Sequence, residues 1–159
     1  MQQMKTRIQL LFVTLLFAQF TTAQDLNIKF LEQITGVSFW SIDDVMENGY
    51  GFKKIKDENG GKEKTYVKGS PDDLSTVLVL KILNSKKALN TLDIRAGTNY
   101  NLQQFKSDLV DNGYLYDGLN KIDMLVYKKD KMTIIIDKNP NSNSKFNQIL
   151  LIPEIEEKF

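Results

Sequence analysis

The side chains that most often carry out chemistry are missing from this sequence. Its 159 residues contain no histidine and no cysteine. Without imidazole, the chain lacks the commonest general base near neutral pH and the usual zinc ligands. Without thiols, it lacks cysteine nucleophiles and the ligands of iron–sulfur clusters. The sequence therefore argues against an enzyme and predicts neither a cofactor nor a metal site.

Carboxylates are the remaining catalytic candidates, because a glycoside hydrolase needs only two of them. The chain has 20 acidic residues, and nothing in their spacing selects a pair from the candidates Asp44, Asp108, Asp117 and Asp123. The loop from Asp137 to Asn143 has oxygen-bearing side chains at alternate positions, as calcium loops do. Ser142 stands where an EF-hand requires glycine, and Gln148 stands where it requires glutamate. We interpret this segment as a polar hairpin loop.

Aromatic side chains are the stronger candidates for contact with a partner, because Tyr and Trp are favoured anchors of protein interfaces. Tyr66, Tyr100 and Tyr127 fall in or beside predicted strands and are candidates for an exposed sheet face. Phe39 and Trp40 precede a predicted helix and are interpreted as a lid on the core, although Trp40 stays a candidate contact. The alternative is that these rings fill the space between helices and sheet.

The first 23 residues have the three parts of a cleavable signal peptide. Lys5 and Arg7 precede the apolar run 10–18, and Thr21 and Ala23 supply the small side chains that signal peptidase requires. The run has about half of the roughly 20 residues that a membrane-spanning helix needs. This favours cleavage after Ala23 over a retained membrane anchor. We expect a secreted or periplasmic protein with one domain over residues 24–159.

The charge of the mature chain argues against a nucleic-acid partner. The whole chain has 21 basic and 20 acidic residues, and Lys5 and Arg7 are lost with the signal peptide. What remains is nearly neutral and has no basic block, whereas nucleic-acid binding depends on clustered positive charge. The absence of cysteine means that an exported chain has no disulfides, which suits a bacterial envelope.

Two nine-residue stretches resemble each other. Residues 44–52 and 108–116 match at an offset of 64 without a gap, and only Gly51 against Leu115 is dissimilar. In each stretch, apolar residues at helical spacing predict a helix that ends at Asn-Gly, where glycine can adopt the left-handed conformation that ends helices. Ser38 or Ser41 is the expected N-cap of the first helix, and Asn101 that of the second. We interpret the match as a structural repeat; the alternative is two unrelated helices that both stop at Asn-Gly.

Strand signals follow each of these helices, and a further short helix is expected within residues 25–36. Alternating apolar residues and turn signals predict the strands, at 50–55, 65–68, 76–83, 89–95, 114–116, 121–128, 132–137 and 148–152. Asn59-Gly60 is a hairpin turn signal, and Pro153 is expected to end the last strand. The predicted fold is an α+β domain of two helix-then-antiparallel-meander repeats, about 24–88 and 89–159, with the helices packed on one face of the sheet.

The helix–Asn-Gly–Tyr steps at residues 44–52 and 108–116, in a tandem chain behind a signal peptide, resemble known exported families. These are the small α+β families typified by β-lactamase inhibitor protein and the outer-membrane assembly lipoproteins, and uncharacterised secreted proteins of Bacteroidota. Such families bind other proteins, so the resemblance implies a binding module. The chain departs from them because it lacks the inhibitor's disulfide and the lipoproteins' lipidated cysteine, and no binding residue carries over.

We therefore expect an exported, non-enzymatic module that recognises a protein or a cell-envelope component. The contact is expected on the open sheet face, with Trp40, Tyr66, Tyr100 and Tyr127 as candidate residues. One alternative is a carboxylate-dependent polysaccharide hydrolase, which requires an acidic cleft. The other is a periplasmic carrier of a small apolar ligand, which requires an enclosed pocket lined by Phe, Leu and Ile.

Overall fold

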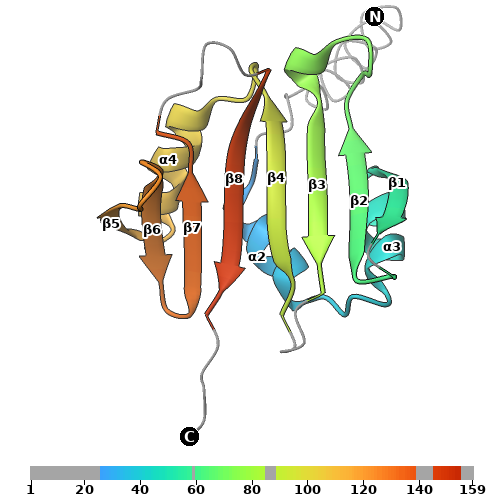
Figure 1. The fold of residues 1–159 in the computed structure, drawn as a ribbon, viewed down its shortest axis with the longest axis horizontal. Helices are drawn as coiled ribbons and strands as arrows, with labels where there is room; N and C mark the ends of the chain where they lie inside the picture. The colour runs from blue at the N-terminus through green and yellow to red at the C-terminus, as the bar shows by residue number, and fades with distance from the viewer. Residues whose placement is uncertain (1–25, 59, 85–88, 139–144, 155–159) are drawn as a thin grey trace, which may run out of the picture.

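One antiparallel sheet of eight strands organises the molecule, in the order β1-β2-β3-β4-β8-β7-β6-β5. A computed structural model describes residues 26–58, 60–84, 89–138 and 145–154 (Figure 1). The strands are β1 Lys53–Glu58, β2 Glu63–Lys68, β3 Leu78–Leu83, β4 Thr91–Gly97, β5 Leu115–Leu119, β6 Leu125–Lys129, β7 Met132–Ile136 and β8 Phe146–Pro153. The helical segments are α2 Ile28–Gly36, α3 Ile42–Asp44, the π-helix η2 Val45–Gly49, the 3-10 helix η3 Leu74–Thr76 and α4 Leu102–Asp111. The chain is an α+β protein.

Alternation along the strands decides which side chains are buried. In β3, Leu78, Leu80 and Ile82 are buried, whereas the residues between them are half-buried. The same alternation continues through β4, β7 and β8, as expected when one face of a sheet packs on a core. The buried face is called the inner face below, and the opposite face is called the outer face.

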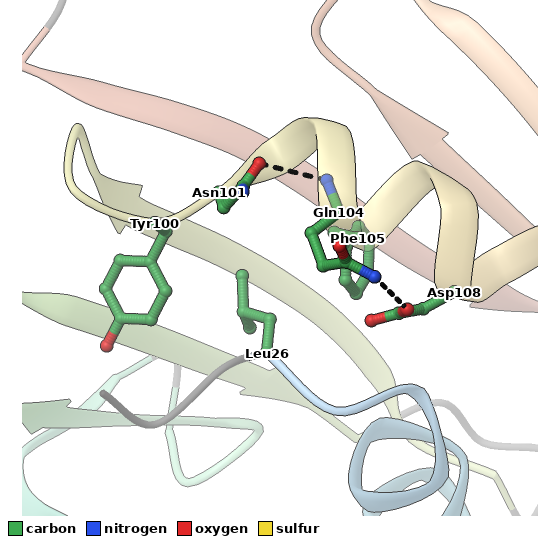
Figure 2. Close-up of a pocket in the computed structure, with 6 residues that line it drawn as sticks. All are labelled: Leu26, Tyr100, Asn101, Gln104, Phe105 and Asp108. Carbon is green, nitrogen blue, oxygen red and sulfur yellow. Dashed lines mark hydrogen bonds between the residues drawn. The ribbon is translucent and has the colours of Figure 1, made fainter. Parts of the chain in front are cut away.

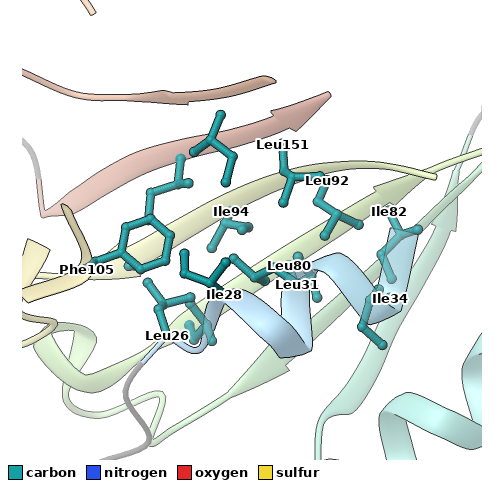
Figure 3. Packing of buried hydrophobic residues seen from close by; sticks show 14 of the residues in the cluster. Leu26, Ile28, Leu31, Ile34, Leu80, Ile82, Leu92, Ile94, Phe105 and Leu151 are labelled. Atoms are coloured by element: carbon teal, nitrogen blue, oxygen red, sulfur yellow. The ribbon is translucent and has the colours of Figure 1, made fainter. Parts of the chain in front are cut away.

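Helix α2 packs against the inner face and confirms the short helix predicted within residues 25–36. Asn27 caps it, because the Asn27 side chain accepts a hydrogen bond from Lys29 N over 2.9 Å. Ile28, Leu31 and Ile34 recur at helical spacing along one side of the helix. In Figure 3 these side chains lie against inward-facing residues of β3 and β4, and all belong to one buried cluster.

Helix α4 begins and ends as its sequence predicts. Asn101 accepts a hydrogen bond from Gln104 N over 2.9 Å and so caps the first turn. Asn112 is the C-cap, and Gly113 follows with a φ of 87°, the left-handed conformation that ends helices. Its buried residues, Leu102, Phe105 and Leu109, join the same core cluster as α2.

The helix of the first half ends differently, and here the sequence prediction is wrong in detail. Ser41 makes no capping hydrogen bond with its side chain. The left-handed glycine is Gly51, with a φ of 67°, and not Gly49, which lies inside the π-helix η2. The closing hydrogen bond runs from Phe52 N to Met46 O, one residue longer than the bond from Tyr114 N to Leu109 O. A π-turn is the usual way for a helix to absorb one extra residue.

The extra residue also shifts the first strand, which starts at Lys53 and not at the predicted Tyr50. Two other strand predictions were too long. Thr76 belongs to η3 and not to β3, and residues 121–124 form a turn before β6. The Asn120 side chain holds that turn by accepting hydrogen bonds from Ile122 N at 3.1 Å and Met124 N at 2.9 Å. Local side-chain acceptors of this kind compete with strand pairing.

The other predicted strands overlap strands of the structure, although their ends differ. The strand predicted at 89–95 corresponds to β4, which spans Thr91–Gly97, and Pro153 is the last residue of β8, as predicted. Asn59 and the predicted signal peptide over residues 1–23 lie outside the described residues. Among the helices of the described ranges, none has the length and apolar character needed to cross a membrane.

Gly97, the last residue of β4, lets the sheet approach η3 closely. A Cβ atom at this position would lie 2.3 Å from Ser75 O and 2.4 Å from Leu74 O. Gly97 N also donates a hydrogen bond to Val77 O over 2.8 Å. Because the neighbouring atoms are backbone, they cannot move aside as a flexible side chain would.

We predict that Gly97→Ala lowers the free energy of unfolding by about 1–3 kcal/mol, the usual cost of overpacking. The matched control is Gly36→Ala, since nothing lies within 4 Å of the Cβ that it would add at the end of α2. The control is expected to be neutral or to stabilise by up to about 1 kcal/mol. Urea denaturation measures both, and equal stability of the two variants would contradict the close approach at Gly97.

Candidate functional site

Two of the aromatic residues proposed as contacts are buried, which corrects the expectation that they lie on an exposed face. Tyr66 is 0% exposed and Tyr127 is 8% exposed. Both point to the inner face, because Tyr66 pairs with Leu80 across β2 and β3 and Tyr127 pairs with Ile134 across β6 and β7. The alternative interpretation, in which rings fill the space between helices and sheet, describes both residues.

Tyr100 is half-buried and packs against the core from the loop before α4. It lines a small pocket, shown in Figure 2, whose other residues are Leu26, Asn101, Gln104, Phe105 and Asp108. The cavity volume is about 10 Å³, room for roughly one water molecule. A carrier of a small apolar ligand needs a far larger enclosure, so this pocket does not support that alternative.

Trp40 is the one proposed contact with a large exposed surface, at 77% exposed. Its neighbour Phe39 is 5% exposed and meets the Trp40 ring edge-on, with ring centroids 5.7 Å apart. The lid predicted for the pair is therefore formed by Phe39, whereas Trp40 points into solvent.

The four carboxylates considered for hydrolysis each contact a different neighbour. Asp44 accepts a hydrogen bond from Asn48, and Asp108 accepts one from Gln104. Asp117 pairs with Lys128 at 2.9 Å, and Asp123 pairs with Lys138 at 3.2 Å. The contacts of the described residues do not join any two of these acids. They give no support for an acid–base pair.

In the described part of the chain, the carboxylate of Asp43 in α3 accepts hydrogen bonds from three side chains. Its Oδ2 accepts hydrogen bonds from Lys64 Nζ at 3.0 Å and from Lys54 Nζ at 3.1 Å. Its Oδ1 accepts one from the Tyr66 hydroxyl. Lys64 is buried, donates also to Phe39 O at 2.9 Å, and lies 4.8 Å from the centre of the Phe39 ring. The cluster ties α3 to β1 and β2.

Electrostatics around Asp43 favour its charged form. Burial raises the pKa of this carboxyl, but the hydrogen bonds from Tyr66, Lys64 and Lys54 outweigh it, and the pKa is lowered. The pKa of Tyr66 is raised well above its ordinary range, first by burial and then by the hydrogen bond to Asp43. Tyr66 therefore stays a protonated donor. The cluster is suited to holding the fold together and offers no free nucleophile.

A second cluster, again of a carboxylate, a tyrosine and a lysine, lies near the opposite half of the sheet, beside β6. Glu32 of α2 accepts hydrogen bonds from the Tyr114 hydroxyl at 3.0 Å and from Lys129 Nζ at 2.9 Å. Lys129 also lies 5.3 Å from the centre of the Tyr114 ring. Burial, followed by the charge of Glu32, raises the pKa of Tyr114 well above its ordinary range. This cluster ties α2 to β6 and to the end of α4.

The outer face carries a group of aliphatic residues that no described helix covers. Cross-strand pairing places Val126 beside Ile135 and Ile135 beside Leu150, while Ile152 follows on β8. Each of the four is half-buried. In Figure 1 this face points toward the viewer, with α2 and α4 behind the sheet. These four residues are called the aliphatic patch below.

Charged residues border the aliphatic patch. Asp93 pairs across the strands with Leu150, and its carboxylate accepts a hydrogen bond from Gln148 Nε2 at 3.1 Å and forms an ion pair with Arg95 at 3.4 Å. Further along the same face Lys81 pairs with Glu63 at 3.5 Å. An apolar centre with a polar rim is the usual anatomy of a protein-binding surface.

Sequence reasoning about aromatic anchors missed the aliphatic patch, although a signal for it was present. A strand with one solvated face alternates apolar and polar residues. The run 149–152 is apolar without interruption, and so is 134–136. Apolar residues on both faces of one strand indicate that the second face also meets something other than water.

Among the described residues, no group of three or more acidic side chains is arranged to hold a metal ion. Most of the loop that resembles a calcium site, residues 139–144, lies outside the described ranges, and Asp137 at its start accepts a hydrogen bond from Gln148 N at 2.6 Å. No family model, curated protein or solved structure matches the chain.

We predict that Asp43 makes stability depend on pH in the acid range. Because its pKa is lower in the folded state, its contribution is complete above the unfolded value of about 3.9 and is lost as the pH falls through the folded value. Asp43→Asn should lower the free energy of unfolding at neutral pH by about 1–3 kcal/mol, since it leaves the buried Lys64 without an anionic partner.

Urea denaturation between neutral and acidic pH measures this effect, with Asp44→Asn as the matched control on the adjacent residue. Below about pH 4, the free energy of unfolding should fall less steeply with decreasing pH in Asp43→Asn than in the control or the unaltered protein. Parallel curves for all three proteins would show that the Asp43 cluster contributes nothing to acid stability.

Proposed function

We propose that this protein is an exported, non-enzymatic binding module that recognises a protein or a cell-envelope component through the outer face of its sheet. The observation that carries the proposal is the aliphatic patch, which has no cover among the described residues and is bordered by the ion pairs of Asp93 and Lys81. Export is proposed from the signal-peptide pattern of residues 1–23. The partner is not a nucleic acid, and no membrane anchor is proposed to remain after cleavage.

The burial of the four aliphatic residues supports this assignment. They are half-buried, so each leaves part of its side chain accessible beside that of its neighbour on the outer face. A partner that covered them would remove adjacent apolar surface from water in one step, which is the main favourable term in association. Asp93, Arg95 and Gln148 would then provide orientation at the rim.

We further propose that the sheet consists of two copies of one unit, a helix followed by a four-stranded antiparallel meander, with the boundary after β4, which ends at Gly97, and not at residue 88 as the sequence predicts. The sheet order supports this, because β1–β4 and β5–β8 run inward from opposite edges and meet at β4 and β8. Burial supports it too, since Ile42 and Met46 correspond to Phe105 and Leu109 at an offset of 63. The ungapped offset of 64 is therefore one residue out of register in the helices, and two residues out at the left-handed glycines Gly51 and Gly113.

The two alternatives have less support. A hydrolase would need two convergent carboxylates, and the four candidates contact separate neighbours. A carrier would need an enclosed apolar cavity, and the pocket beside Tyr100 holds about one water molecule. The proposed resemblance to exported protein-binding families agrees with the binding module, but it does not identify a partner.

The proposal predicts that Leu150→Lys, within the aliphatic patch and opposite Ile135, weakens capture of the partner by at least about tenfold, since the main contacts of an interface commonly contribute more than about 1 kcal/mol. The protein is immobilised and exposed to envelope extract, and captured molecules are quantified by mass spectrometry. Leu150 is half-buried, so the variant should keep its fold, which circular dichroism checks.

Trp40→Lys is the matched control, because it also replaces an apolar residue with lysine, here at an exposed position away from the outer face. Capture should survive in this control. Loss of capture in Trp40→Lys with retention in Leu150→Lys would assign the contact to Trp40 and overturn the proposal. Equal capture by all three proteins, or no specific capture at all, would also overturn it.

A further inference from the structure

The two free edges of the sheet have opposite chemical character. At one edge, β1 carries Lys53, Lys54 and Asp57, and Lys54 pairs with Asp57 at 2.9 Å. Charged side chains, lysine above all, are how proteins prevent edge strands from pairing with other chains. At the other edge, β5 carries Leu115, Tyr116 and Leu119, which are 73%, 55% and 46% exposed. Both edge strands carry a β-bulge, but only β1 is composed mainly of charged residues.

The apolar surface at the β5 edge is concentrated and extends beyond the strand. Eight large hydrophobic residues are exposed in the described part of the chain, and five of them fall within residues 110–122. Besides the three on β5, they are Val110 in the last turn of α4 and Ile122 in the turn before β6. Clustering of this kind marks an interaction surface, whereas scattered exposed residues need no explanation.

We propose that β5 pairs edge to edge with β5 of a second copy of this chain, in antiparallel orientation. An edge strand presents unpaired backbone N–H and C=O groups, so its natural occupant is another extended strand. This surface differs from the outer face, so the proposal does not rest on the proposed function.

The faces of β5 fit a copy of themselves. Tyr116 lies opposite Tyr127 and Leu119 lies opposite Leu125, so both point to the inner side. Consider a two-fold axis perpendicular to the sheet, between positions 117 and 118. Such an axis places the inner faces of the two copies on the same side of the joined sheet. It sets Tyr116 beside Leu119 of the second copy, and Leu119 beside its Tyr116. Two aromatic–aliphatic cross-strand pairs result, a type of pair that stabilises sheets.

Sterics and charge at the axis are also compatible with a second copy. Gly118 has no side chain, and nothing lies within 4 Å of the Cβ position, so the two strands can approach there. Asp117 is the bulged residue and is already paired with Lys128 at 2.9 Å. The two Asp117 carboxylates would therefore lie near each other at the axis, each neutralised by Lys128 of its own chain.

Sedimentation velocity of the purified full chain, from micromolar to millimolar concentration, tests the proposal. The expected result is a monomer–dimer equilibrium, and Leu119→Lys should weaken the dimer by at least about tenfold because the substitution enters both symmetric pairs. Ile55→Lys is the matched control, since Ile55 is 58% exposed at the bulge of the β1 edge. It should leave the equilibrium unchanged.

Disulfide trapping gives a second readout, because the chain has no cysteine of its own. Asp117→Cys lies beside the proposed axis and should form a cross-linked dimer on oxidation, whereas Ile55→Cys should remain monomeric. A monomer at millimolar concentration would overturn the proposal. A dimer that survives Leu119→Lys, or that is lost only in Leu150→Lys, would also overturn it, the latter by assigning dimerisation to the outer face.

Discussion

The pairing of β4 with β8 is the interaction on which the rest of the structure depends. Leu92 pairs with Leu151 and Ile94 with Ile149, and all four side chains are 0% exposed. These residues join segments more than fifty positions apart into one continuous sheet. Without this seam the chain would form two separate four-stranded sheets with four free edges. The seam also gives α2, which contacts β4, a surface broad enough to bury one side of a helix.

Local signals were enough to predict much of this fold. Asn101 caps a helix and Gly113 ends it because a side-chain acceptor and a left-handed backbone act within one turn. Pro153 ends β8 for a similarly local reason. The π-turn at 45–49 escaped prediction, since a single extra residue leaves no mark in composition or periodicity. The seam escaped it as well, because strand pairing over such a separation depends on the whole chain.

The candidate site was harder to predict than the fold. Strand periodicity tells which residues share a face, but it does not tell which face the helices cover. Tyr66 and Tyr127 were assigned to the wrong face for that reason, and Tyr66 tolerates burial because its hydroxyl donates to Asp43. The aliphatic patch could have been found from strands that are apolar on both sides. Trp40 was predicted to form a lid on the core together with Phe39, but it is exposed, and Phe39 forms the lid alone.

The position of β8 at the centre of the sheet has a consequence for the order of folding. Helix α2 is the first described element to leave the ribosome, yet the sheet it packs on includes the last described strand. Contacts of such long sequence separation form slowly, because the chain must close large loops before they yield any stability. The nascent chain therefore cannot reach its native state until β8 has been synthesised, and until then the sheet of the first half has one side unpaired. During that interval β4 is a temporary edge, rich in Leu92 and Ile94, that a holding chaperone could recognise.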